Sequence, residues 1–170
     1  MPVYVALLRA VNVGGTGKLP MTDLKRLCEE AGMTAVQTYI ASGNVLFKSD
    51  LAAAAVQAAL DEKLRAYAGK PVGLLIRSAI QMAETAARNP FPNQPGNRVT
   101  ALFTDEPLPT DVLDGVSGRQ QEELCLGQGE IFIFYGDGMA KTRLRVPAAD
   151  RGTARNMNTV AKLAEMAAKL

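Results

Sequence analysis

The chain has 170 residues, of which 48% are apolar and 21% are charged, and its formal net charge is +2. This composition is ordinary for a packed globular protein of one domain or two small ones, and so small a charge does not by itself indicate a nucleic-acid partner. The sequence contains no histidine, which excludes Ser-His-Asp and Cys-His mechanisms and removes the usual nitrogen ligand of zinc.

The first half is expected to alternate strands and helices in the order β-α-β-β-α-β. Residues 3–8 form an unbroken apolar run typical of a central strand covered on both faces. A helix with one apolar face follows Pro20 and stops at Gly32. The next elements are two strands joined by a turn, a helix that Ser49 or Asp50 can cap, and a strand. Their expected ranges are 36–40, 45–48, 50–69 and 72–77.

A boundary between two halves is predicted at residues 89–97, which are rich in Pro, Asn and Gly. A connecting helix precedes it and begins at Ser78, where the spacing is that of a capping box. After the boundary the order starts again as β-α-β-β-α. The expected elements are strands over 99–103, 123–126 and 131–135, a short helix near Thr110, and a final helix over about 153–169.

These patterns together predict an α+β fold made of two sequential ferredoxin-like α/β sandwich halves. The first half, residues 1–88, would be a βαββαβ unit with the connecting helix. The second, residues 98–170, would be a βαββα unit that lacks an obvious final strand and ends in a C-terminal helix. We expect the two halves to pack closely as one compact unit.

The start of the chain, the lengths of its apolar runs and its two cysteines indicate the cellular location of the protein. The start of the chain lacks the pattern of a signal peptide, and its apolar runs are too short to cross a bilayer, so we expect a cytoplasmic protein with no membrane partner. Cys28 and Cys125 have no partner at motif spacing. We interpret both as small buried apolar residues, because neither has a visible base or helix N-terminus to activate a thiol.

The first of three polar clusters is the loop from Arg9 to Lys18. It joins the end of the predicted central strand to the start of a helix, which is a favoured place for ligands. Glycines such as Gly14 and Gly15 let backbone N–H groups cradle an anion, and the two cations add charge. The spacing matches neither the Walker loop nor the dinucleotide fingerprint. A glycine-rich turn kept only for its geometry is the alternative.

The second cluster is Ser42-Gly43-Asn44, between two predicted strands. Gly and Asn tolerate a positive φ, so an ordinary hairpin turn explains these residues. The alternative is that the turn lies beside the first loop and contributes to the same site.

The third cluster is a basic stretch that leads into the final helix. This stretch contains one acidic residue, Asp150, and five basic residues, which are Lys141, Arg143, Arg145, Arg151 and Arg155. Cations near a helix N-terminus oppose the helix dipole, which favours a bound anion there. Arg155, Asn158 or Thr159, and Lys162 would also share one helical face. The alternative is a solvated basic surface.

These clusters resemble the bacterial proteins of the "domain of unknown function 1697" family. The matching segments are LLRAVNVGG at 7–15, KLPM at 18–21, TYIASGNV at 38–45, NPF at 89–91 and TARNMNTV at 153–160, followed by Lys162-Leu163. The family usually has glycine where Ala10 stands and tryptophan where Met157 stands, and the second difference removes an aromatic that could stack on a base. The resemblance implies a duplicated α+β fold and carries over no established activity.

We therefore interpret the chain as a protein that binds a phosphate-bearing or other anionic small ligand, such as a nucleotide. The candidate ligand-binding residues are Arg9, Asn12, Gly14, Gly15, Lys18, Ser42, Asn44, Arg155, Asn156, Asn158 and Lys162. The sequence identifies no cofactor, no metal site and no oligomeric state. Two alternatives stay open: a histidine-independent enzyme that acts on a phosphorylated substrate, and a nucleic-acid-binding protein suggested by fold analogy alone.

Overall fold

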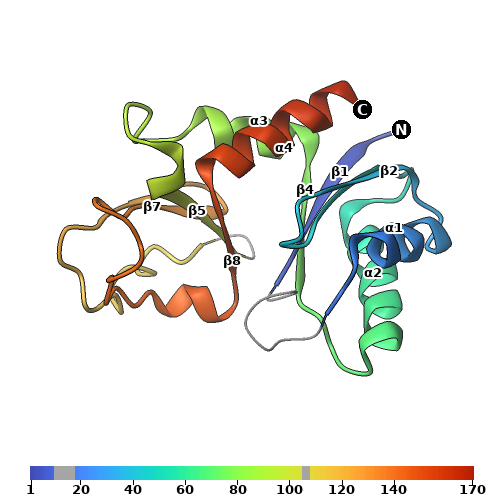
Figure 1. Cartoon of the computed structure of the whole chain (residues 1–170), viewed down its shortest axis with the longest axis horizontal. Helices are drawn as coiled ribbons and strands as arrows, with labels where there is room; N and C mark the ends of the chain where they lie inside the picture. The colour runs from blue at the N-terminus through green and yellow to red at the C-terminus, as the bar shows by residue number, and fades with distance from the viewer. Residues whose placement is uncertain (10–17, 105–107) are drawn as a thin grey trace. The chain divides into compact units, whose positions relative to one another are not determined.

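The computed structural model describes residues 1–9, 18–104 and 108–170 (Figure 1). In that part of the chain there are two four-stranded antiparallel sheets, four α-helices and two short 3₁₀ helices. The residues divide into two compact units, one made of 1–83 with 163–170 and the other of 84–162. No helix among these residues is long and apolar enough to cross a membrane.

The first unit is organised around β1 (Val3–Leu8), the second strand from one edge of its sheet. The strand order is β2-β3-β1-β4, with β3 (Asn44–Lys48) and β4 (Leu74–Ser78) pairing antiparallel to β1 and β2 (Thr34–Tyr39) pairing with β3. Every residue of β1 after the first is buried. This confirms the predicted central strand covered on both faces.

Helices α1 (Met21–Glu30) and α2 (Ala53–Ala68) lie together on one face of this sheet (Figure 1). Their apolar stripes enter the core of the unit through Leu24, Leu27, Cys28, Val56, Leu60 and Leu64. Gly32 and Gly69 follow the two helices in the left-handed region, at φ of +89° and +71°, as predicted. The predicted side-chain cap of α2 is wrong, because α2 begins after Ala52, which makes no side-chain cap hydrogen bond.

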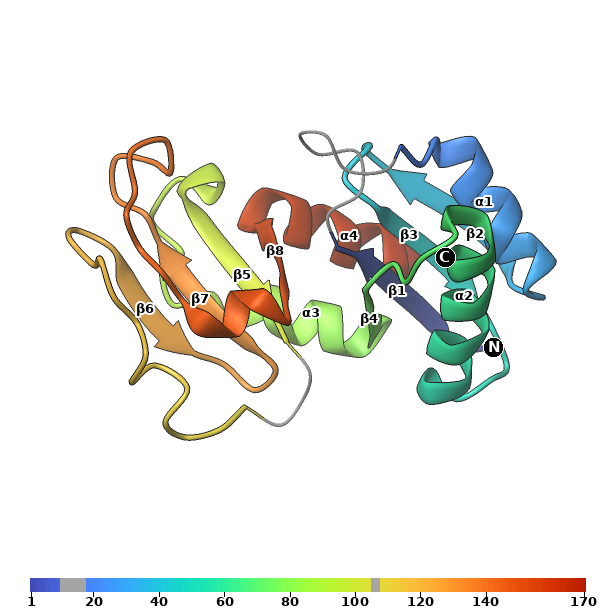
Figure 2. The same ribbon diagram turned by 90° about the horizontal axis from the view of Figure 1, so that it is seen from below.

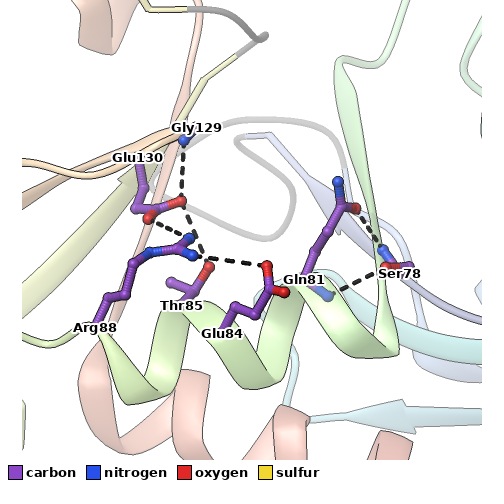
Figure 3. Close-up of polar contacts among 7 residues, drawn as sticks. All are labelled: Ser78, Gln81, Glu84, Thr85, Arg88, Gly129 and Glu130. Atoms are coloured by element: carbon purple, nitrogen blue, oxygen red, sulfur yellow. Dashed lines mark hydrogen bonds and ion pairs between the residues drawn. The ribbon is translucent and has the colours of Figure 1, made fainter.

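Helix α3 (Ala79–Ala87) begins with the predicted capping box. The backbone N–H of Ser78 donates to Oε1 of Gln81 at 2.8 Å, and the N–H of Gln81 donates to Oγ of Ser78 at 3.1 Å (Figure 3). The two reciprocal bonds satisfy N–H groups that a helix start leaves open. The helix ends before Pro90, as the sequence indicates.

The second unit contains a sheet in the order β6-β7-β5-β8. Figure 2 shows β5 (Val99–Phe103), β7 (Glu130–Phe134) and β6 (Glu123–Leu126) side by side. The fourth strand, β8 (Thr153–Asn156), pairs antiparallel with β5. The expectation of a missing final strand is therefore wrong. The sequence of β8 resembles a helix start, but its pairing with β5, about fifty residues earlier in the chain, makes it a strand.

Two further expectations for this unit are corrected. Helix α4 (Met157–Lys169) begins four residues later than predicted, immediately after β8. Residues 110–115 form turns instead of a short helix. Val112 and Leu113 in these turns pack against the buried core of the sheet, so apolar burial is achieved there without a regular helix. The 3₁₀ helices are η1 (Gly96–Arg98) and η2 (Pro147–Asp150).

A buried carboxylate connects the end of α3 to the β6–β7 hairpin in the second unit. The side chain of Glu130 is 2% exposed, and its Oε1 accepts a hydrogen bond from Nη2 of Arg88 at 2.9 Å (Figure 3). Its Oε2 accepts hydrogen bonds from the Thr85 hydroxyl at 3.4 Å and the Gly129 N–H at 3.3 Å. A buried charge needs such compensating donors, so these contacts hold the hairpin against the helix end.

Arg88→Met should lower the free energy of unfolding by about 2–3 kcal/mol at neutral pH, because it leaves the Glu130 carboxylate buried with one strong donor fewer. Urea denaturation measures this effect. The matched control is Glu84→Gln, which removes the other carboxylate near Arg88, 3.6 Å away and 53% exposed. That change should cost less than about 0.5 kcal/mol, and equal losses in the two variants would contradict the assignment.

The two cysteines differ in burial. Cys28 is fully buried on α1, and this burial raises the pKa of its thiol to about 12. Cys125 is exposed on the edge strand β6, so the expectation of a buried residue is wrong there. An edge strand pairs on one side only, and the side chains of β6 are largely exposed.

Thiol reagents should therefore distinguish the two cysteines in the native protein. At pH 8 we expect one thiol, Cys125, to react rapidly, and Cys28 to react only after denaturant is added, because thiolate is the reactive form. Counting released chromophore with time measures both rates. Cys125→Ser should abolish the fast phase alone, and a fast phase that survives in this variant would refute the prediction.

Candidate functional site

The end of β1 lies between two other backbone segments of the first unit. The N–H of Leu8 donates to the carbonyl of Gly43 at 2.9 Å, and the N–H of Arg9 donates to the carbonyl of Gly73 at 2.8 Å. The β2–β3 turn and the start of β4 therefore flank the point where the polar loop begins. That loop, residues 10–17, lies outside the described residues, and so do the predicted site residues Asn12, Gly14 and Gly15.

Arg9 is partly buried, and its side chain lies across Gly73. A Cβ atom added to Gly73 would be 2.9 Å from Cδ of Arg9 and 3.3 Å from Cγ, so a residue with a side chain there would displace the side chain of Arg9. Gly73 is thus the residue that makes room for the aliphatic part of Arg9. Gly73 is not among the site residues predicted from the sequence, although a glycine at the start of a strand pattern often marks a close approach of this kind.

The β2–β3 turn is held by Asn44. This residue is fully buried, and its Nδ2 donates to the carbonyl of Tyr39 and to Oγ of Ser42, both at 3.0 Å. Gly43 has a φ of +88°, as expected of the turn, and Ile40 has a φ of +50°. A positive φ is unfavourable for a β-branched residue, so the turn stores strain that its hydrogen bonds must offset.

Lys18 connects the first two clusters. Its side chain is exposed, and with Leu19, Pro20, Met21 and Ala41 it lines a cavity of about 340 Å³. The end of the polar loop and the β2–β3 turn therefore border one cavity. The structure thus brings Arg9, Lys18, Ser42 and Asn44 to one end of the first sheet.

Arg155 and Asn156 belong to the second unit and lie on β8. Arg155 is 8% exposed, and its Nη1 donates to Oγ1 of Thr153 at 2.7 Å and to the carbonyl of Ala154 at 3.0 Å. Burial lowers the pKa of Arg155 to about 10, which leaves the side chain charged at neutral pH. Oδ1 of Asn156 accepts the N–H of Thr159 at 2.9 Å and so caps α4.

The predicted basic helical face is therefore wrong, because Arg155 precedes α4 and only the other residues of that face lie on the helix. The amide of Asn158 lies against Gly96, where a side chain would collide with it. Lys162 is exposed.

Metal chemistry has no visible ligand set in the described ranges. Among residues 1–9, 18–104 and 108–170, no three or more Asp, Glu or Cys side chains gather in a way that could hold a metal ion.

The described residues form a mixed α/β protein with two four-stranded antiparallel sheets, and a cavity that Lys18 and four apolar residues line lies at one end of the first sheet. Residues 1–132 match the family described as "Protein of unknown function (DUF1697)", and the chain belongs to this family. The resemblance inferred from the motifs is confirmed.

A solved structure shares this architecture over nearly the whole chain. It is described as the structure of conserved bacterial protein SP0830 from Streptococcus pneumoniae, and it is similar with a TM-score of 0.79 and 25% sequence identity. The similarity covers 98% of each chain. No curated protein matches the sequence.

Asn44→Ala should lower the free energy of unfolding by roughly 1–3 kcal/mol, because it removes the hydrogen bonds from the buried Asn44 amide to the carbonyl of Tyr39 and to Oγ of Ser42. Thermal or urea unfolding measures the loss. Ser42→Ala, at an exposed position, removes only one acceptor and should have the smaller effect. If Ser42→Ala were the more destabilising change, the turn would not depend on Asn44.

Proposed function

We propose that the chain binds a small phosphate-bearing or other anionic ligand at the end of the first sheet, between Arg9, Lys18 and the β2–β3 turn. The observation that carries the proposal is the cavity that Lys18 shares with Ala41 beside the end of β1. The ends of central strands that lead into helices are common places for anionic ligands.

The two cations are suited to different parts of the task. Arg9 offers a planar guanidinium that can bind a phosphate through two hydrogen bonds. Its aliphatic part lies across Gly73, which limits the conformational freedom that binding would remove. Lys18 is an exposed point charge on a flexible chain. On the sequence argument alone, Asn12, Gly14 and Gly15 of the intervening loop would add backbone and amide donors.

The proposal rests on the first unit alone. Arg155 and Asn156 are engaged within the second unit, by Thr153 and by the start of α4 respectively. Their side chains support the β8–α4 junction, so we do not assign them to the anion. Asn44 is buried in the turn and would act as a positioning residue that shapes the cavity wall.

The strand orders support a ferredoxin-like layout for this binding fold. In β2-β3-β1-β4 and in β6-β7-β5-β8, the first strand of each unit lies between the third and the fourth. Two sheets with the same arrangement are expected of a duplicated βαββαβ plan. In the second unit, turns at 110–115 and the 3₁₀ helix η2 would stand where the plan has helices.

The protein should bind inorganic phosphate or pyrophosphate at millimolar concentration or below, measured by isothermal titration calorimetry at low salt. Arg9→Ala and Lys18→Ala should each weaken binding about tenfold, which corresponds to about 1.4 kcal/mol. Added salt should weaken it further, because exposed charges are screened.

The matched control is Lys48→Ala, which removes the same charge at the opposite end of β3. It should leave the affinity unchanged. The proposal fails if wild-type protein binds neither anion, or if Lys48→Ala weakens binding as much as the two site variants do.

A further inference from the structure

A second cavity adjoins the proposed anion site. It has a volume of about 260 Å³ and is lined by Lys18, Leu19, Leu64, Tyr67, Ala68 and Lys70. Lys18 and Leu19 also line the cavity at the β2–β3 turn, so the two cavities share these two lining residues. The second cavity extends the site from the start of α1 to the end of α2.

The lining of this cavity is divided between apolar and charged groups. Leu19 and Leu64 are 4% and 1% exposed and supply an apolar floor. Lys18 and Lys70 are exposed, so their ammonium groups can reach a ligand at the rim. Small-ligand sites usually combine an apolar surface with a few polar groups that fix the orientation of the ligand.

Tyr67 supplies an aromatic wall whose position is held from outside the cavity. Tyr67 lies in the last turn of α2 and is 40% exposed. Its hydroxyl donates a hydrogen bond to Oδ2 of Asp23 on α1 at 2.7 Å. This bond raises the pKa of Tyr67 above its usual value, so the phenol stays neutral at physiological pH.

The negative charge of Asp23, which would repel an anion in this cavity, is partly offset by neighbouring side chains. Nη2 of Arg26 lies 4.0 Å from Oδ1 of Asp23, while Tyr67 binds the other oxygen, Oδ2. Asp23 therefore has a cation and a phenol as neighbours. The two lysines of the lining remain the charged groups that a ligand in the cavity would meet.

We propose that the ligand of the anion site is a nucleoside phosphate, with its phosphate at Lys18, its base against the ring of Tyr67, and Lys70 adding a second ammonium group at the rim of the cavity that holds the base. The inference rests on the proposed anion-binding function. The aromatic wall and the apolar floor of the cavity suit a flat aromatic ring, and the two ammonium groups suit a phosphate. A nucleoside phosphate carries both groups. Stacking of a base on an aromatic side chain is sequence-tolerant, so the geometry selects the class of ligand and not one base.

The sizes of the cavities agree with a mononucleotide. Each of them, at about 260 and 340 Å³, lies near the lower limit for small-ligand sites. Lys18 lines both cavities, so a phosphate bound at Lys18 leaves the second cavity, with Tyr67, for the base and the sugar.

The test compares adenosine monophosphate, ribose 5-phosphate and inorganic phosphate as ligands of the full chain by isothermal titration calorimetry. Adenosine monophosphate should bind at least tenfold more tightly than ribose 5-phosphate, because only the former carries a base to stack. Tyr67→Ala should abolish this preference and leave the affinity for ribose 5-phosphate unchanged. Tyr67→Phe, which keeps the ring and loses only the bond to Asp23, should retain most of it.

Lys70→Gln provides the second arm. It should lower the affinities for adenosine monophosphate and for ribose 5-phosphate by a similar factor, since it removes a charge and no stacking surface. If Tyr67→Ala is poorly folded, as judged by thermal unfolding, Tyr67→Leu preserves apolar bulk without the ring and should show the same loss of preference.

The outcomes separate the two proposals. Equal affinity of wild-type protein for adenosine monophosphate and ribose 5-phosphate overturns the nucleoside assignment, and so does a preference that survives in both Tyr67→Ala and Tyr67→Leu. In either case binding of inorganic phosphate that depends on Lys18 leaves the anion site standing. Absence of binding by all three ligands overturns both.

Discussion

The backbone of β1 is the constraint on which the rest of the first unit depends. Its side chains are buried after Val3, and it forms antiparallel ladders with β3 on one edge and β4 on the other. A strand held on both edges and both faces cannot slide without moving every side chain to the wrong face. The last two ladder-like bonds, from Leu8 and Arg9, therefore determine where the polar loop begins and which turns flank it.

The polar residues of this chain divide into those that serve the fold and those that face solvent. Glu130, Asn44 and Arg155 are buried, and each has partners within its own unit. Their partners offset the loss of water that burial requires. Lys18 and Lys70 are exposed and line cavities, so they are available to a ligand. Exposure, more than residue type, separates the two groups.

The proposed nucleotide site follows from the way two helices meet their sheet. Packing of α1 and α2 on one face brings the start of one helix close to the end of the other, as the contact between Asp23 and Tyr67 shows. Residues nearly fifty positions apart then line one cavity with Lys18. The sequence pattern of either helix alone does not indicate that Asp23 and Tyr67 lie side by side.

Local patterns in the sequence determined β1, through its unbroken apolar run. They also determined the glycine stops after α1 and α2 and the capping box at Ser78, because these depend on contacts within a few residues. The sequence motifs also indicated the family to which the chain belongs, and the match of residues 1–132 to the family confirms it. Only the tertiary structure decided that Thr153–Asn156 is a strand, that Cys125 is exposed and that Tyr67 faces a cavity. These outcomes depend on pairing and packing between segments distant in the chain, where the free energy of a long-range ladder or a buried surface outweighs local preference.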